Sequence, residues 1–147
     1  MGVLSRLGIS PNMLTLFGVL GNVGAGALAA SGEFWQAGVV MLAFSAKDFL
    51  DGALARATGQ ATPFGSVFDA VLDRVSEAAV LFGILIYFSD RGGRSEEILA
   101  FAAVVGSILV SYVRARAQII GLNLREGLFT RAERVILLAA GLIIDQV

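Results

Sequence analysis

The chain has 147 residues, of which 56% are hydrophobic and 16% charged, and its formal net charge is -1. This hydrophobic fraction exceeds the roughly 45–50% apolar share of a soluble domain, and it indicates a protein with several membrane spans. The sequence contains no cysteine and no histidine, which excludes disulfides, thiolate chemistry and the commonest general base. Catalysis would therefore depend on carboxylates, hydroxyls, Lys, Arg and bound metal. One domain over residues 1–147 accounts for the length, and we expect no nucleic-acid partner.

Five apolar segments follow one another along the chain, and they predict an all-α, polytopic membrane bundle. The first covers residues 11–30, with Pro11 at an early helical position. The second runs from Phe34 to about residue 57, the third covers 65–88 and the fourth about 96–118. The fifth begins near Ala132 and runs to the C-terminus. It is barely long enough to cross a bilayer, which needs about 20 residues.

Lysine and arginine are distributed unevenly between the two sides of this predicted bundle. If the N-terminus is cytoplasmic, the outer ends of the spans carry only Arg91 and Arg94. The inner ends carry Arg6, Lys47, Arg56, Arg114, Arg116, Arg125, Arg131 and Arg134. The positive-inside rule favours this orientation. The outer ends then carry a predicted aromatic belt of Phe34, Trp35, Tyr87 and Phe88.

The first segment is rich in small residues. Gly18, Gly21 and Gly24 lie three apart, and Ala25 and Ala29 extend the series. Small residues allow membrane helices to approach closely, so this segment is predicted to pack tightly against its neighbours.

Four aspartates interrupt the second and third segments. Asp48 and Asp51 are spaced i, i+3, and Asp69 and Asp73 are spaced i, i+4, so each pair lies on one face of its helix. Both pairs fall toward the cytoplasmic ends of adjacent antiparallel spans and can converge on one site that opens to the cytosol. An ionised Asp at the centre of a membrane helix costs roughly 2.5–3.5 kcal/mol, and four together repel one another. The cluster therefore needs cations.

Several readings of the cluster follow from spacing alone. Hard oxygen ligands in this number suit Mg²⁺ or Mn²⁺. Two pairs could hold two ions, an arrangement that stabilises the attacking and leaving oxygens in phosphoryl transfer. Structural ion pairs with Lys47, Arg56 and Arg74 are a second reading. A cation or proton transporter is a third, because intramembrane carboxylates also build transport pathways.

The residues around the aspartates form a longer pattern. It reads Asp48-x-x-Asp51-Gly52-x-x-Ala55-Arg56, then eight residues, then Gly65-x-x-x-Asp69-x-x-x-Asp73. This pattern resembles the signature of the CDP-alcohol phosphotransferase family, and the resemblance extends from "SPNMLT" to "RAERVILL". It implies a membrane enzyme that transfers a phosphatidyl-type group from CDP-diacylglycerol or CDP-archaeol to an alcohol and releases CMP. Family members usually have six spans, so the five seen here are a departure, and the sequence leaves open whether a C-terminal sixth span is missing or the protein has five.

The resemblance also implies roles for individual residues. Asp48, Asp51 and Asp69 would bind metal, and Asp73 would bind metal and act as general base. The residues at donor-contacting positions are Asn12, Thr15, Gly52, Arg56 and Thr62. On physical grounds, Gly52 and Gly65 leave room for a bulky nucleotide, and Arg56 can reach diphosphate oxygens. A homodimer is a further expectation from the family.

Arginines gather between the fourth and fifth segments, where the positive-inside rule alone could account for them. Arg131 and Arg134, however, are spaced i, i+3 at the start of a helix, where exposed amide groups favour an anion, and Arg114 ends the fourth segment. We therefore expect these three to bind a phosphate on the acceptor. The run "SYVRARAQIIGLNLREGLFTRAERVILL" resembles the branch that makes phosphatidylinositol phosphate or archaetidylinositol phosphate, which implies inositol 1-phosphate. Glycerol 3-phosphate, serine and free inositol are the alternative acceptors.

Overall fold

The computed structural model describes the backbone of residues 11–57, 63–122 and 131–144, and the side chains of residues 15–46, 63–122 and 132–144. All the regular structure in these ranges is α-helical. The helices are α2 (Pro11–Ala30), α3 (Phe34–Ala57), α4 (Pro63–Arg91), α5 (Arg94–Ile119) and α6 (Arg131–Ile144). The five predicted segments and the all-α class are therefore confirmed. α4 and α5 extend slightly beyond the predicted third and fourth segments at both ends.

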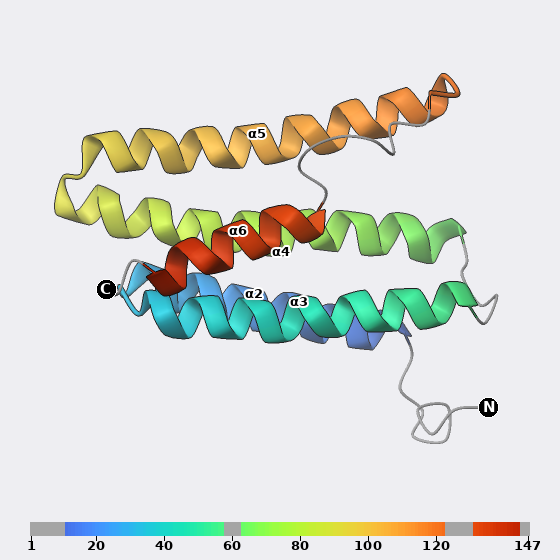
Figure 1. Cartoon of the computed structure of the whole chain (residues 1–147), viewed down its shortest axis with the longest axis horizontal. Coiled ribbons are helices and arrows are strands. Elements are labelled where there is room, and N and C mark those ends of the chain that lie inside the picture. The colour runs from blue at the N-terminus through green and yellow to red at the C-terminus, as the bar shows by residue number, and fades with distance from the viewer. Residues whose placement is uncertain (1–10, 58–62, 123–130, 145–147) are drawn as a thin grey trace.

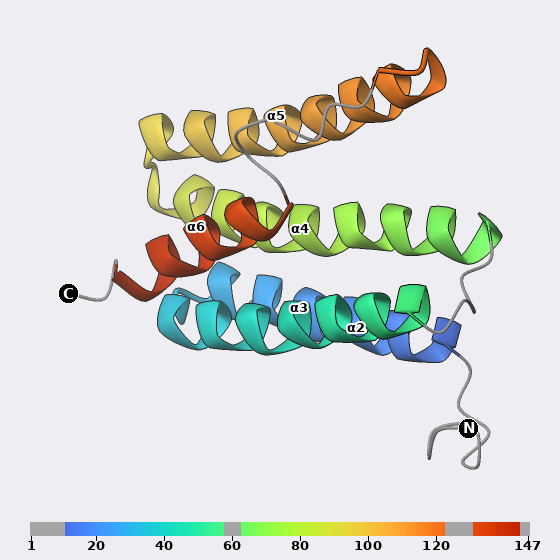
Figure 2. The same cartoon turned by 45° about the vertical axis from the view of Figure 1, so that its right-hand side comes forward.

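The first four helices run up and down along one axis, and α6 runs at a slant to them (Figures 1 and 2). α2 packs against both α3 and α4, α5 packs against α4, and α6 packs against α3. Two tight turns, at residues 31–33 and 92–93, lie at the same end of the bundle, which we call the turn end. α3 finishes and α4 begins at the opposite end, which we call the aspartate end.

Glycine makes both tight turns possible. Gly32 and Gly92 have φ values of +87° and +73°, a region in which a side chain would be strained. In each turn the next amide bonds back to the last helical turn, Glu33 N–H to the Leu28 carbonyl at 2.9 Å and Gly93 N–H to the Phe88 carbonyl at 3.0 Å. These bonds satisfy carbonyls that the end of a helix leaves without partners.

α2 and α4 approach each other closely through small residues. A Cβ atom on Gly83 would overlap the carbonyl oxygen of Gly26, and one on Gly26 would overlap that of Ala79. The tight packing expected of the first segment is confirmed, because Ala25 and Ala29 are fully buried and a Cβ atom on Gly21 would overlap the Phe44 ring of α3. Gly26, which the predicted series did not include, also approaches α4 closely, whereas Gly24 has open space around it.

Substitution of Gly83 by alanine is expected to lower the melting temperature of the protein. The added methyl group would force α2 and α4 apart, and overpacking of this kind costs about 1–3 kcal/mol. Gly106→Ala in α5 is the matched control, because a Cβ there meets no atom within 4 Å. Alanine should be neutral or slightly stabilising at that position, since it is the better helix former. Equal melting temperatures for the two variants would contradict the close α2–α4 contact.

The surface of the bundle is strongly apolar, and α5 shows this most clearly. Within the described ranges, α5 is the one helix that is long and apolar enough to cross a membrane by the combined test of length and composition. Shorter apolar stretches cover Thr15–Ala30 and Phe34–Ala46. Leu99 and Phe101 of α5 are 69% and 60% exposed. Exposed apolar surface of this extent needs a covering partner or an apolar solvent.

The predicted aromatic belt divides into two parts at the turn end. Phe34 is buried and packs edge-on against Tyr87, with their ring centroids 4.6 Å apart, and the Arg91 guanidinium lies 3.8 Å from the centroid of the Tyr87 ring. Trp35, by contrast, is 53% exposed. Phe34 therefore belongs to the core, and Trp35 lies on the outer surface.

Candidate active site

The four aspartates occupy matching positions on two antiparallel helices. Asp51 and Asp48 stand six and nine residues before α3 ends at Ala57. Asp69 and Asp73 stand six and ten residues after α4 begins at Pro63. With a rise of about 1.5 Å per residue, each pair begins about 9 Å inside the aspartate end. The two pairs are therefore level with each other along the bundle axis (Figure 1).

The α4 pair is described down to its side chains. Asp69 and Asp73 are both half-buried, and their i, i+4 spacing places them on one face of the helix. Arg74 directly follows Asp73, and its Nη1 donates a hydrogen bond to the Ala70 carbonyl at 2.6 Å. The side chains of Asp48 and Asp51 lie outside the described residues, as does that of Lys47.

The four aspartates supply the kind of donor atoms that a divalent metal site needs. Two carboxylates on one face of α4, level with two more on α3, supply the oxygen ligands that Mg²⁺ and Mn²⁺ prefer. Among the side chains that the structure describes, no three metal-ligating residues form a cluster, and half of the predicted ligand set, Asp48 and Asp51, lies outside those side chains. The assignment of the four aspartates as metal ligands stays a prediction.

The predicted donor-contacting residues fall at the same end of the bundle. Thr15 lies near the start of α2 and Gly65 near the start of α4, and both are half-buried. Asn12, Gly52 and Arg56 are described only as backbone, Asn12 within α2 and the other two within α3. Thr62 lies wholly outside the described residues. The backbones of the other five residues lie toward the aspartate end.

The predicted acceptor arginines come from α5 and α6. Arg114 is half-buried and stands five residues before α5 ends at Ile119, at the aspartate end. The side chain of Arg131 lies outside the described residues. Arg134, in the first turn of α6, donates from Nε to Oε1 of Glu77 at 2.9 Å and from Nη2 to Oε2 at 3.1 Å. The side chains are only 13% and 7% exposed, respectively.

Glu77 did not enter the interpretation of the sequence, although a signal was present. It is an acidic residue inside an apolar segment, four residues after Asp73, so it lies on the same helix face one turn further into the bundle. An acidic group there needs a cation. The partner could not be read from the sequence, because Arg134 is 57 residues away.

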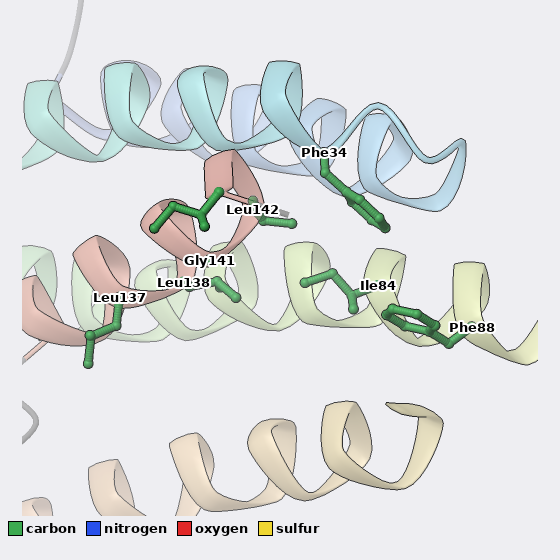
Figure 3. A pocket seen from close by; sticks show the side chains of 8 residues that line it. Phe34, Ile84, Phe88, Leu137, Leu138, Gly141 and Leu142 are labelled. Atoms are coloured by element: carbon green, nitrogen blue, oxygen red, sulfur yellow. The ribbon is translucent and has the colours of Figure 1, made fainter. Parts of the chain in front are cut away.

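An apolar groove of about 480 Å³ opens between α3, α4 and α6. Phe34 of α3, Ile84 and Phe88 of α4, and Leu138 and Leu142 of α6 line it (Figure 3). Its lining comes from the turn-end halves of α3 and α4, away from the aspartates. The groove is therefore separate from the carboxylate site.

The fold and the site together define a class of protein. It is an all-helical bundle with two level aspartate pairs at one end, and Gly52, Arg56 and Gly65 lie at set distances from these aspartates along the sequence. The family model described as CDP-alcohol phosphatidyltransferase matches residues 8–145. The chain therefore belongs to the CDP-alcohol phosphatidyltransferase family.

Two curated relatives are similar over nearly the whole chain. The archaetidylinositol phosphate synthase of Pyrococcus horikoshii is 40% identical over 141 residues, which are 92% of this chain and 70% of that protein. The phosphatidylinositol phosphate synthase of Mycobacteroides abscessus is 38% identical over 142 residues, which are 95% of this chain and 64% of that protein. The chain thus spans about two thirds of the length of these relatives.

Solved structures of a relative have the same fold. The crystal structure of Mycobacterium tuberculosis phosphatidylinositol phosphate synthase with CDP-DAG bound superposes with a TM-score of 0.88 at 34% identity, over 97% of this chain and 73% of that one. A second crystal structure of the same protein, in complex with manganese and citrate, has a TM-score of 0.84 at 34% identity, over 97% of this chain and 69% of that one.

Proposed function

We propose that this chain carries the catalytic domain of a phospholipid-synthesis enzyme. It transfers a phosphatidyl-type group from CDP-diacylglycerol or CDP-archaeol to inositol 1-phosphate and releases CMP. The observation that carries the proposal is the level arrangement of the two aspartate pairs at the aspartate end. It occurs in a chain that is 34% identical to a phosphatidylinositol phosphate synthase crystallised with CDP-DAG.

The proposed reaction is a single displacement at phosphorus. Asp73 accepts the proton of an acceptor hydroxyl, whose oxygen then forms a bond to the phosphorus attached to the lipid. The bridging P–O bond breaks, and CMP leaves with the bridging oxygen. Two Mg²⁺ or Mn²⁺ ions, when bound by Asp48, Asp51, Asp69 and Asp73, supply positive charge beside the diphosphate. Arg56 and the small residues Gly52 and Gly65 hold the CDP moiety.

The proposal places the bundle across a membrane with its aspartate end in the cytoplasm. The exposed apolar surface of α5 then contacts lipid rather than water, and the lipid tails of the donor stay in the bilayer. The exposed Trp35 lies at the opposite, outer interface, where amphipathic rings are favoured. The homodimer stays a prediction from the family resemblance.

The acceptor assignment depends on arginines near the aspartates. Arg114 stands at the aspartate end of α5, and Arg134 contacts the residue one turn beyond Asp73. Together with Arg131, they would place guanidinium groups around the acceptor phosphate. Guanidinium groups bind phosphate oxygens in a planar, bidentate geometry, so a phosphorylated acceptor fits this set better than serine or free inositol does.

The test of the proposal is release of CMP by the purified protein from CDP-diacylglycerol, with a panel of acceptors. Inositol 1-phosphate should support release, and glycerol 3-phosphate, serine and free inositol should support little. A sodium or proton flux assay in liposomes addresses the transporter alternative. If ions cross the liposome membrane without an acceptor and no CMP is released, the protein is a transporter and the proposed function is wrong.

Substitution of Arg131 by alanine is expected to raise the acceptor KM strongly and to leave the KM for CDP-lipid almost unchanged. A charge-assisted hydrogen bond contributes about 1.5–3 kcal/mol, which corresponds to roughly 10- to 150-fold in affinity. Arg131→Lys should rescue only part of the loss, because an ammonium group lacks the planar fork.

Arg94→Ala provides the matched control, because Arg94 is exposed at the turn end. It should leave both KM values unchanged. If Arg131→Ala behaves like Arg94→Ala, the arginines of this segment serve membrane orientation, and the acceptor phosphate is bound elsewhere.

A further inference from the structure

The ion pair between Glu77 and Arg134 is largely buried inside an apolar bundle, where the desolvation of two charges costs free energy. The desolvation of a buried pair often exceeds its Coulombic gain, and apolar side chains of similar volume stabilise such a position equally well or better. The presence of the pair is therefore weak evidence that it stabilises the fold. A bidentate contact does, however, fix the plane and the direction of a guanidinium group.

The position of the pair relates it to the aspartate site. Glu77 follows Asp73 by four residues, so it lies on the same face of α4 about 6 Å further along the helix. α6 packs mainly against α3, and the long Arg134 side chain extends from the first turn of α6 to α4. Glu77 therefore determines where along α4 the guanidinium group lies, one turn below the proposed base.

We propose that Glu77 is a positioning residue, which holds the Arg134 guanidinium in place for the phosphate of the acceptor. The inference depends on the proposed function, in which Arg134 binds that phosphate. Glu77 touches neither substrate in this account and acts through Arg134. Its carboxylate also balances the charge of Arg134. The guanidinium group can therefore stay charged inside the bundle before the acceptor phosphate binds.

The experiment measures KM and kcat for inositol 1-phosphate, and KM for CDP-diacylglycerol, in wild type and Glu77→Gln. Glutamine keeps the shape and one acceptor oxygen but loses the charge and the second ionic contact. The expected result is an acceptor KM raised about ten-fold or more, the effect of one misplaced charge-assisted contact, with an unchanged donor KM. Glu97→Gln is the matched control, because Glu97 accepts a hydrogen bond from Ser89 at the turn end at 3.2 Å.

Glu77→Asp is the second variant, and it keeps the negative charge should Glu77→Gln fail to fold. Its carboxylate is one methylene shorter, so the guanidinium should shift and the acceptor KM should rise several-fold. A melting temperature lowered in both variants, with an unchanged acceptor KM, would overturn the inference and leave Glu77 a structural partner only.

The failure of this inference can be told apart from the failure of the proposed function. If wild type releases CMP with inositol 1-phosphate while the Glu77 variants keep a wild-type acceptor KM, only the positioning role is wrong. If wild type releases no CMP with any phosphorylated acceptor, the proposed function and the role of Glu77 are both overturned.

Discussion

Replacement of Asp73 by asparagine should lower kcat by about 10²–10⁴-fold, the usual contribution of a general base. Asparagine matches aspartate in shape but cannot accept the proton of the acceptor hydroxyl. Asp48, Asp51 and Asp69 remain to bind metal, so CDP-lipid should still bind with near wild-type affinity. Single-turnover CMP release, together with a separate measurement of CDP-lipid binding, distinguishes the two effects.

Asp90→Asn is the control for this variant, because Asp90 is exposed at the other end of the same helix. It should retain wild-type kcat. If Asp73→Asn keeps more than about a tenth of the wild-type rate, its loss is below the range expected of a general base, and the proton must leave by another route.

Removal of divalent metal should abolish CMP release altogether. Carboxylates supply the whole predicted ligand set, and a chain without cysteine or histidine favours a hard cation such as Mg²⁺ or Mn²⁺. Activity lost in excess chelator should return when either metal is added in excess of the chelator. Chelator that is already saturated with Mg²⁺ is the control and should not inhibit.

Asp69→Asn separates metal binding from proton transfer. This residue is a predicted ligand but not the base, so its variant should need a higher Mg²⁺ concentration for half-maximal rate and should recover much of its kcat when saturated. Full activity of wild type in excess chelator would rule out the metal assignment.

The sequence predicted the helices, and the place of each aspartate along its helix, because both depend on local patterns. Apolar segments bounded by glycine and charged residues predicted five helices close to the observed ones. The i, i+3 and i, i+4 spacings placed each aspartate pair on one helix face once the helices were known. The level arrangement of the two pairs then follows from a short connection between α3 and α4.

Contacts between distant segments could not be predicted in the same way. The contact of Gly26 with Gly83 depends on how α2 rotates against α4, and a series of small residues is compatible with several rotations. The Glu77–Arg134 pair depends on α6 packing against α3 with its first turn beside the middle of α4. Phe34 was expected at the membrane interface, but its contact with Tyr87 directs it into the core.

The most direct test of the proposed reaction is the mass of its lipid product. Purified protein, CDP-diacylglycerol, inositol 1-phosphate and Mg²⁺ should yield CMP and a lipid in equal amounts. That lipid should carry two phosphate groups, one from the donor and one from the acceptor. A lipid with a single phosphate made from free inositol or serine, or no acceptor-dependent lipid at all, would contradict the account.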